Sequence, residues 1–446
     1  MKPRQGCQIA WGGTNRVRGS LDLAGPRVCV VGVQHDTSPV AVREKLSIPR
    51  RQMREALASL RGYLSSGIIL ATCNRTEVYA IEEDDNSTEQ AIRRFLEDWA
   101  GVSEEELAPY LYHSSNHEAM RHLSQTASGL CSMVVGEHEI LGQTRRALQD
   151  AEQAQMVNLP LKKLFQHAIR TGRRVRDKTD ISRNALSVSA AAVDLAAKLT
   201  SDIRYRRVLL IGAGEAGKLV ARALSQMGVS QVTVASRALR NAQELASVLG
   251  GNAIHLSQLQ SELEAADILI SCTDAPHFVV HRELVEEVMA SRPGRPLVVI
   301  DIAVPRDVEP EVGQIEDVFL YDIDQFNQVS EVNRKAREKE AARAIAVVDD
   351  EMQRFLAWWR TLEAKPTISA LTQMAEDIRQ RQLRVTLKKL PPLSQEERDS
   401  LDAMTKAIVN KILHSPIKCL KHSGQGRGDF VQAVRELFAL DGQVSE

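Results

Sequence analysis

The spacing of apolar residues in the first part of the chain predicts short strands and helices in turn. Arg27–Val33 (RVCVVGV) is rich in valine and therefore predicts a strand. In residues 50–61, Met53, Leu57 and Leu60 recur at the spacing of one helix face. After an N-terminal segment, the chain is therefore expected to form a strand and then a helix.

Two more strands follow before the pattern becomes helical. Ile68–Ala71 and Glu77–Ile81 are short apolar runs, and the polar residues Thr72–Thr76 connect them. From about residue 88 onward the apolar spacing is that of helices. The order strand, helix, strand, strand and then helices predicts a small α+β domain.

A regular alternation begins after an alanine-rich helix at Ala185–Leu199, which leads into the strand Arg207–Ile211. Four more short apolar runs alternate with helical segments: Val232–Ala235, Ile268–Ser271, Leu297–Asp301 and Val318–Tyr321. Strands that alternate with helices predict a parallel, doubly wound sheet of the Rossmann type.

The last part of the chain has an uninterrupted helical signal. Between Gly313 and Pro366 there is no glycine or proline, and residues 325–363 are rich in Ala, Glu, Arg and Gln, which favour helix. At about 1.5 Å per residue this helix would extend on the order of 55 Å, so we expect a spacer. Further helices are predicted near 367–389, 395–414 and 427–440, with breaks at Pro391–Pro392 and Pro416.

An all-α tail on a long helix is typical of dimerisation, so a homodimer is expected. Trp358 and Trp359 and the apolar residues beyond them need a second surface to cover them, and another copy of the chain is the simplest supplier.

These patterns predict an α/β multidomain protein with four segments. Residues 1–26 form a flexible N-terminal extension, and residues 27–183 form an α+β catalytic domain. Residues 184–324 form a Rossmann-type nucleotide-binding domain, and residues 325–446 form the long helix with an all-α C-terminal dimerisation domain.

Composition adds few constraints. Of the 446 residues, 43% are hydrophobic and 26% are charged, as in ordinary globular proteins. Lys and Arg total 57 and Asp and Glu total 58, so an RNA partner would have to meet a local basic face. The most basic stretch, residues 162–183, is either a solvated helix face or a face that contacts phosphates, and the first is favoured.

The cysteines and the apolar runs indicate in which cellular compartment the protein is expected. The six cysteines form no CxxC pair, so neither a metal site nor a disulfide framework is predicted, which suits a reducing cytoplasm. No apolar run of roughly 18 residues occurs, so no membrane span is expected. Residues 1–26 lack the apolar stretch of a secretion signal, and a disordered tail or an over-long start is favoured over an organelle transit peptide.

A glycine-rich turn follows the strand Arg207–Ile211 and opens a helix. Its residues match GxGxxG: Gly212, Ala213, Gly214, Glu215, Ala216 and Gly217. The first glycine makes the tight turn, the second lets backbone approach a pyrophosphate, and the third allows helix and strand to pack. The helix N-terminus favours the anion. The alternative is a structural α/β unit without a ligand.

The end of the second strand of this region bears on the choice of cofactor. An NAD-specific site would place Asp or Glu there, to hold the ribose hydroxyls. This chain has Ser236 and Arg237, with Arg240 one helical turn later, which favour the 2′-phosphate of NADPH. The alternative is that Arg237 is a solvated surface residue.

Cys73 lies in a polar connection between two apolar strands, whereas most cysteines are buried and inert. Arg75, two residues on, is expected to favour the thiolate. Thr72, Asn74 and Arg75 are donors suited to a carboxylate and an acyl oxygen. A thiolate that takes an acyl group as a thioester, beside a nicotinamide domain that supplies hydride, would yield an aldehyde.

Five segments resemble motifs of the glutamyl-tRNA reductases, over about residues 27–440 and in the right order. Residues 71–77 (ATCNRTE) resemble the signature S-T-C-N-R-T-E, and residues 32–40 (GVQHDTSPV) are similar to the first-strand motif. Residues 128–143 (SGLCSMVVGEHEILGQ) resemble the segment that ends in G-E-P-Q-I-L-G-Q. Residues 301–310 (DIAVPRDVEP) match a further stretch, and residues 414–418 (HSPIK) resemble H-x-P-x-K.

The resemblance implies NADPH-dependent reduction of glutamyl-tRNA(Glu) to glutamate 1-semialdehyde through a thioester on Cys73, which opens tetrapyrrole (porphyrin) synthesis. It implies a V-shaped homodimer and, as a further partner, glutamate-1-semialdehyde aminomutase. His122 matches a histidine that assists activity, although alone it would more often be structural. The positions that match substrate-binding residues are Thr72, Asn74, Arg75, Ser132, Glu137, His138, Glu139 and Gln143.

Three departures from the family pattern keep alternatives open. Glu139 stands where the family usually has Gln, Gln34 replaces Asn, and Cys131 replaces an acidic residue. A diverged paralogue would be an NADP oxidoreductase acting on another acyl or carbonyl group, or a non-catalytic regulator that binds tRNA.

Overall fold

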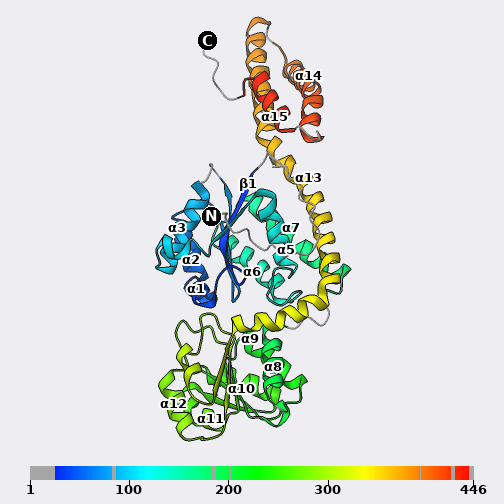
Figure 1. Ribbon diagram of the computed structural model, residues 1–446. Coiled ribbons are helices and arrows are strands. Elements are labelled where there is room, and N and C mark those ends of the chain that lie inside the picture. The colour runs from blue at the N-terminus through cyan, green and yellow to red at the C-terminus, as the bar shows by residue number, and fades with distance from the viewer. Residues whose placement is uncertain are drawn as a thin grey trace. The chain divides into compact units, whose positions relative to one another are not determined.

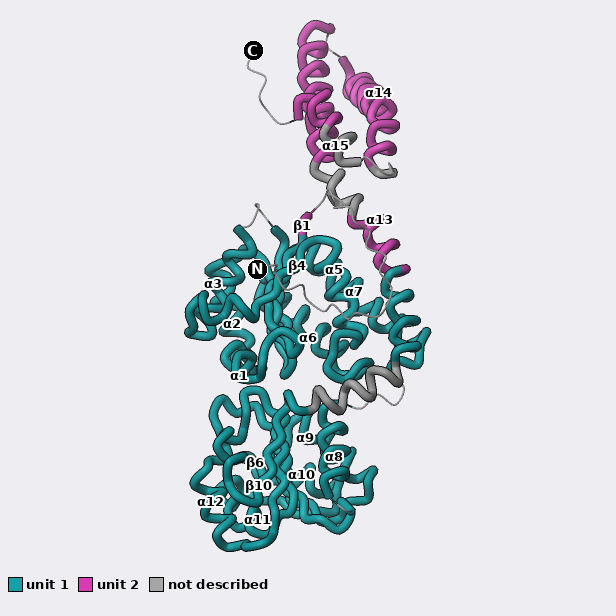
Figure 2. The backbone as a smooth tube through the Cα atoms, in the orientation of Figure 1, with its two compact units in different colours: residues 1–15, 28–349 teal, residues 16–27, 350–446 magenta. Residues whose placement is uncertain are grey.

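The computed structural model describes residues 26–82, 87–182, 187–200, 202–391, 393–422 and 427–440. It divides into two compact units, one built on Val28–Asp349 and the other on Asp350–Glu446 (Figure 2). The larger unit contains both predicted sheets, and the smaller unit is helical.

The first sheet has four strands in the order β2-β3-β1-β4. Its strands are β1 (Arg27–Gln34), β2 (Ile68–Thr72), β3 (Arg75–Glu82) and β4 (Tyr112–Ser115). The accompanying helices are α1 (Val40–Arg43), α2 (Met53–Leu60), α3 (Ser87–Ala100), α4 (Glu104–Leu107), α5 (Asn116–Ala127), α6 (Glu139–Gln153) and α7 (Leu159–Lys178). Figure 1 shows α2 and α3 on one side of this sheet and α5 to α7 on the other.

Two local predictions in this region were wrong. The strands β2 and β3 pair as far as Thr72 and Arg75, so the connection is a two-residue turn, Cys73–Asn74, rather than five residues. The strand β4 lies where only helix was expected, because four residues (YHSS) are too few to show alternation. The strand forms through its antiparallel pairing with β1.

The second sheet has six strands in the order β10-β9-β8-β5-β6-β7, and every neighbouring pair is parallel. Its strands are β5 (Val208–Ile211), β6 (Val232–Ser236), β7 (Asn252–His255), β8 (Ile268–Ser271), β9 (Leu297–Asp301) and β10 (Val318–Asp322). Its helices are α8 (Val188–Leu199), α9 (Glu215–Gln226), α10 (Leu239–Leu249), α11 (Leu259–Ala265) and α12 (Arg282–Ala290). The predicted doubly wound, Rossmann-type sheet is confirmed.

Alternate residues of β5 fill the cores on the two faces of this sheet. Val208 and Leu210 pack in one cluster, with Val220 of α9, while Leu209 and Ile211 pack in the other, with Val285 of α12. Burial on both faces explains the continuous apolar runs of these strands. The edge strand β7 was missed, because its sequence, NAIH, contains no such run.

The long helix α13 (Phe326–Lys389) continues beyond the predicted end and passes Pro366 without a break. The helix α14 (Gln395–His422) likewise contains Pro416, which was expected to end it, and α15 (Arg427–Leu437) follows. A proline inside a helix costs about 3 kcal/mol. Packing of Leu413, Ile417 and Leu420 in one apolar cluster offsets that cost in α14.

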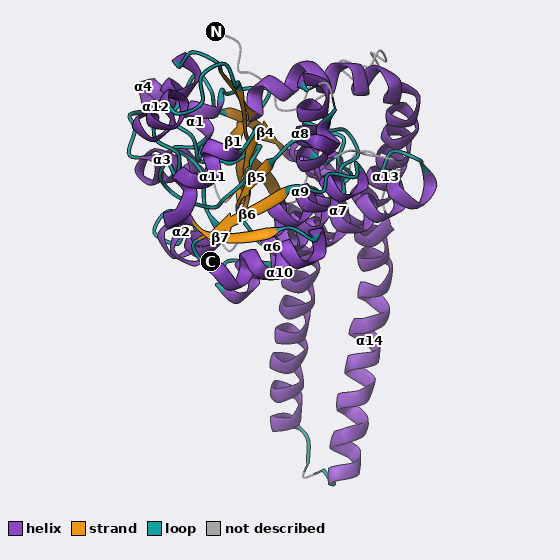
Figure 3. Ribbon diagram, turned by 90° about the horizontal axis from the view of Figure 1, so that it is seen from below, coloured by secondary structure: helices purple, strands orange, loops and turns teal. Residues whose placement is uncertain are grey.

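In the smaller unit, α14 runs alongside the C-terminal half of α13 (Figures 1 and 3). Arg379 of α13 donates to Asp402 at 2.6 Å and to Thr405 at 3.1 Å. Trp359 is fully buried and its indole N–H donates to the carbonyl of Pro26 at 3.1 Å, so the same chain covers this side chain. Among the residues that the structure describes, no helix is both long and apolar enough to cross a membrane.

Candidate functional site

The Cys73–Asn74 turn is held by hydrogen bonds from three segments. The amide of Asn74 donates to Thr72 Oγ1 at 3.1 Å, and the amide of His35 donates to the Asn74 carbonyl at 2.9 Å. Arg43 Nη1 donates to the Cys73 carbonyl at 3.1 Å. Cys73 is a free, half-buried cysteine. The turn therefore presents one thiol from a fixed backbone.

The surroundings of Cys73 favour the protonated thiol. The pKa of Cys73 is raised to about 12, chiefly by burial and also by the carboxylates of Glu137 and Glu139, while Arg43 acts in the opposite direction. The expectation that Arg75 favours the thiolate was wrong, because the opposing cation is Arg43. Removal of the Cys73 thiol proton therefore needs either a nearby base or a charge that the bound substrate brings.

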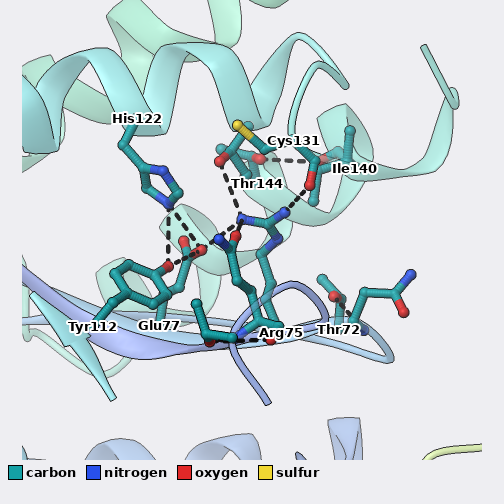
Figure 4. A network of polar contacts seen from close by, with 12 residues as sticks. Thr72, Arg75, Glu77, Tyr112, His122, Cys131, Ile140 and Thr144 are labelled. Carbon is teal, nitrogen blue, oxygen red and sulfur yellow. Dashed lines mark hydrogen bonds and ion pairs between the residues drawn. The ribbon is translucent and has the colours of Figure 1, made fainter. Parts of the chain in front are cut away.

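The side chain of Arg75 extends into a buried polar network with Glu77 and Cys131 (Figure 4). Its Nη1 lies 2.6 Å from Glu77 Oε1 and donates to Thr126 Oγ1 at 3.2 Å, while its Nη2 donates to the carbonyl of Cys131. Both charged side chains are almost fully buried. Burial alone would raise the pKa of Glu77, but Arg75 and His122 hold it well below its usual range.

His122 belongs to the same network. Its Nε2 lies 3.0 Å from Glu77 Oε1 and 3.2 Å from the Tyr112 hydroxyl. The tyrosines Tyr79 and Tyr112 both donate to the Glu77 carboxylate. The structure thus gives His122 a contact to Glu77, and through it to Arg75.

The segment before α6 brings two carboxylates towards the thiol. Glu137 is buried, and burial raises its pKa to about 7. Glu139 begins α6 and its pKa is raised by burial, with Arg146 opposing and Glu215 reinforcing the shift.

The other two predicted substrate-binding residues of this segment differ in exposure. His138 is exposed, and its Nε2 lies 3.0 Å from the carbonyl of Ser182. Gln143 is half-buried in α6. Of the predicted residues in the segment, Glu137 and Glu139 are those whose charges reach Cys73.

The glycine-rich turn has the geometry that the sequence predicted. Gly212 has a φ of +111°, and a Cβ on Gly217 would lie 2.1 Å from the Gly212 carbonyl oxygen, so helix and strand touch there. A Cβ on Gly214 would meet nothing within 4 Å, so backbone is open to a ligand at that position. Ala213 and Ala216 pack against the same apolar cluster as Cys73.

Ser236 ends β6, and its hydroxyl accepts from the amide of Ala238 at 3.3 Å. Arg237 is exposed and pairs with none of the residues that the structure describes. Arg240 already pairs with Glu244 at 2.9 Å. Arg237 is therefore the cation of this strand end that is available to a ligand.

Sequence reasoning missed Arg43 and Asp324, which form an ion pair beside Cys73. Arg43 lies in a short polar segment, VREK, which resembles a solvated helix, yet its side chain is 2% exposed. No sequence signal linked it to a residue 281 positions away.

The sequence motifs also did not predict a cluster that contains a cysteine, a carboxylate and a histidine. Cys29, Glu82 and His113 place one ligand atom each within 4.8 Å of one another. His113 Nδ1 already lies 3.3 Å from Glu89, which Arg93 binds at 2.7 Å. Arg93 therefore supplies a positive charge next to this cluster through its ion pair with Glu89.

A thiol on a hairpin turn and an open glycine-rich turn, packed against one apolar cluster, define a Rossmann-type oxidoreductase with a candidate cysteine nucleophile. Three family models match successive parts of the chain: the N-terminal domain of glutamyl-tRNAGlu reductase over residues 31–179, shikimate/quinate 5-dehydrogenase over residues 194–329, and the glutamyl-tRNAGlu reductase dimerisation domain over residues 343–440. The chain belongs to the glutamyl-tRNA reductase family.

Full-length relatives support this assignment. The glutamyl-tRNA reductase of Carboxydothermus hydrogenoformans is 41% identical over 416 residues, which cover 92% of each chain. That of Bacillus subtilis is 40% identical over 396 residues, 88% of this chain and 87% of the relative. The solved glutamyl-tRNA reductase of Methanopyrus kandleri matches with a TM-score of 0.50 and 32% identity, over 93% of this chain and 99% of that one.

Proposed function

We propose that this protein reduces the glutamyl group of glutamyl-tRNA(Glu) to glutamate 1-semialdehyde with NADPH, through a thioester on Cys73, as the first step of tetrapyrrole synthesis. The observation that carries the proposal is that Cys73 packs against the same cluster as Ala213 and Ala216 of the nucleotide turn. Thioester formation and hydride transfer need these two parts close together.

The first half-reaction transfers the glutamyl group to sulfur. Cys73 Sγ attacks the glutamyl carbonyl carbon, the ester bond to the terminal ribose of the tRNA breaks, and the thiol proton passes to the released ribose oxygen. Glu137 is suited to carry this proton, because burial raises its pKa to about 7 and a general acid–base group works best near the operating pH.

The second half-reaction releases the aldehyde. NADPH bound at the glycine-rich turn would supply the hydride that reduces the carbonyl carbon. The carbon–sulfur bond then breaks, and a proton returns to Cys73 Sγ, so that the enzyme regains its thiol. A thioester is more readily reduced than the ester from which it came, and this is the reason for first transferring the glutamyl group to the cysteine.

The glutamyl group is assigned to the residues around the turn. We propose that Thr72 and Asn74 contact it first, since they flank Cys73. Arg75 would bind a substrate carboxylate while it remains paired with Glu77, and His122 would act through Glu77 as a positioning residue. The remaining proposed contacts are Ser132, Glu137, His138, Glu139 and Gln143.

The glycine-rich turn fits a dinucleotide. Gly214 is open where a pyrophosphate would approach, and the N-terminus of α9 favours an anion. The backbone of Gly212 to Gly217, with Ala213, Glu215 and Ala216 between the glycines, would hold the pyrophosphate. Ser236 and the exposed Arg237 suit a 2′-phosphate, so NADPH is preferred to NADH.

The match to the dimerisation-domain family supports a homodimer as the working form. Family membership also suggests glutamate-1-semialdehyde aminomutase as the partner that takes up the product. We place the protein in the cytoplasm.

The decisive experiment follows NADPH oxidation with glutamyl-tRNA, with free glutamate and with neither. We expect turnover only with the charged tRNA. Without NADPH, label from the glutamyl group should become trapped on wild-type protein but not on Cys73→Ser, which should fold and bind tRNA normally. Full activity of Cys73→Ser, or turnover on free glutamate, would refute the proposal.

A further inference from the structure

We infer that Arg43 is a positioning residue, and that its ion pair with Asp324 couples the docking of the nucleotide-binding domain to the geometry of the Cys73 turn. The inference rests on the proposed function, and it concerns residues that no motif assigned.

One buried guanidinium joins two distant parts of the chain. Arg43 Nη1 donates to the Cys73 carbonyl at 3.1 Å and to Asn74 Oδ1 at 3.2 Å. Its Nη2 pairs with Asp324 Oδ1. Arg43 thus holds both residues of the turn and, at the same time, a carboxylate of the nucleotide-binding domain.

Asp324 binds both ends of the short helix α1. Its Oδ1 meets Arg43 and its Oδ2 accepts from the amide of Val40 at 2.7 Å. Its own amide donates to Asp322 Oδ1 at 3.1 Å, which ties it to the end of β10. Asp324 is therefore attached to the six-stranded sheet and at the same time binds the helix α1, which carries Arg43.

The pairing of charges makes this contact a link between the docking of the nucleotide-binding domain and the geometry of the Cys73 turn. If the domains separate, Arg43 loses its ion pair and keeps two neutral hydrogen-bond acceptors, the Cys73 carbonyl and the Asn74 side-chain amide, with the carboxylate of Glu44 near it. Loss of the paired counter-charge is unfavourable for this cation, so α1 and the turn lose their fixed geometry when Asp324 leaves. Independently of this geometry, the positive charge of Arg43 lowers the pKa of Cys73.

A second ion pair on the same interface supplies a matched control. Glu44 accepts from Arg306 at 2.7 Å, and Ser47 donates to the carbonyl of Val304 at 3.2 Å. Glu44 is adjacent to Arg43 in the sequence, but within the described part of the chain it forms no hydrogen bond with the Cys73–Asn74 turn. Loss of this pair weakens docking without releasing Cys73.

The test compares Asp324→Asn with Glu44→Gln in the full-length protein. For each variant, trapping of labelled glutamate on Cys73 without NADPH measures acyl transfer, and NADPH oxidation with glutamyl-tRNA measures the whole reaction. Asp324→Asn should lower kcat of the whole reaction by at least about tenfold, since small misplacements of reacting groups cost that much or more. Glu44→Gln should change kcat by less than about threefold, because the Glu44–Arg306 pair does not hold the reacting thiol in place.

A readout on the thiol itself separates positioning from simple loss of stability. The midpoint pH for alkylation of Cys73 should rise in Arg43→Gln, because the cation is removed. It should remain near that of the wild type in Arg43→Lys and in Glu44→Gln. NADPH binding should be retained in all of these variants, which verifies their folding.

Equal losses of kcat in Asp324→Asn and Glu44→Gln would overturn the inference, and so would an unchanged alkylation midpoint in Arg43→Gln. If Asp324→Asn does not fold, Asp324→Glu keeps the charge but displaces it, and kcat like that of Glu44→Gln would count against coupling. Absence of trapped label in the wild-type protein would refute the proposed function instead.

Discussion

At the scale of single residues, burial and nearby charge have opposite effects on the pKa of Glu77. Its carboxylate is fully buried and meets Arg75, Tyr79, Tyr112 and His122. Removing a carboxylate from water is unfavourable, so this arrangement is stable because the guanidinium and the hydrogen bonds replace water. Loss of one partner would leave the other charge buried and alone.

Glu77→Gln should therefore lower the free energy of unfolding by about 3–5 kcal/mol. The folded-state pKa of Glu77 lies below its value in the unfolded chain, because Arg75 and His122 outweigh the opposing effect of burial. Its stabilisation is complete above about pH 4.3 and is lost as the pH falls towards the folded-state pKa. Urea unfolding across this pH range should show the difference between the two proteins shrinking in acid.

The matched control is Glu244→Gln, which removes an exposed pair with Arg240 at 2.9 Å. It should lower the free energy of unfolding by less than about 0.5 kcal/mol. Comparable losses in the two variants would mean that burial of the Glu77 pair has no special effect on stability.

Arg237→Ala should weaken NADPH binding by about 1.5–3 kcal/mol and leave NADH binding nearly unchanged, since it removes a charge-assisted contact to the 2′-phosphate. Fluorescence titration with both cofactors measures this. Arg240→Ala is the control, because Arg240 is already paired with Glu244. Equal weakening for the two cofactors would exclude Arg237 from the choice.

At the scale of elements, two glycines of the turn between β5 and α9 have different roles, one in packing and the other in ligand binding. Gly217→Ala should destabilise the six-stranded domain by about 1–3 kcal/mol or more, because its Cβ would lie 2.1 Å from the Gly212 carbonyl oxygen. Gly214→Ala should fold normally, since its Cβ meets nothing within 4 Å, but should weaken NADPH binding roughly tenfold or more.

Thermal unfolding and NADPH titration of both glycine variants distinguish the two effects. A normal melting temperature for Gly217→Ala would contradict the close approach of helix and strand. Unchanged NADPH affinity in Gly214→Ala would show that the dinucleotide does not approach this backbone.

At the scale of the whole molecule, the first part of α13 belongs to the larger unit. Asp349 pairs with Arg121 at 2.9 Å, and Glu340 accepts from the amide of Asp180 at 2.9 Å. The smaller unit carries an apolar stripe at helical spacing on α14, where Met404, Ile408 and Ile412 are all at least half exposed. This stripe suits a second copy of the chain.

Truncation after Asp349 should therefore yield a monomer that binds NADPH, whereas the full chain should be a dimer. A cut after Asp324 would also remove the contacts of α13 with the larger unit, so the later cut is the cleaner test. Light scattering at micromolar concentration decides it. A full-length monomer would remove the dimer proposal, and a truncated dimer would place the interface in the larger unit.

Local chemistry by itself determined much of this protein. The apolar runs from Val208 to Tyr321 predicted the parallel sheet, because strands buried on both faces must be continuously apolar. The GxGxxG turn was predicted for the same kind of reason, since only glycine tolerates the φ of Gly212 and the close approach at Gly217. The position of the thiol on a turn followed from Cys73 lying among polar residues between two strands.

Tertiary structure alone decided which charges meet. Arg75 is two residues from Cys73, yet its guanidinium lies with Glu77, while Arg43 and Asp324, 281 positions apart, meet beside the thiol. Likewise Pro366 and Pro416 lie inside helices, although local rules predict breaks. The physical reason is that burial makes a counter-charge or an apolar partner worth more than any local preference, and those partners are supplied by parts of the chain that no local pattern connects.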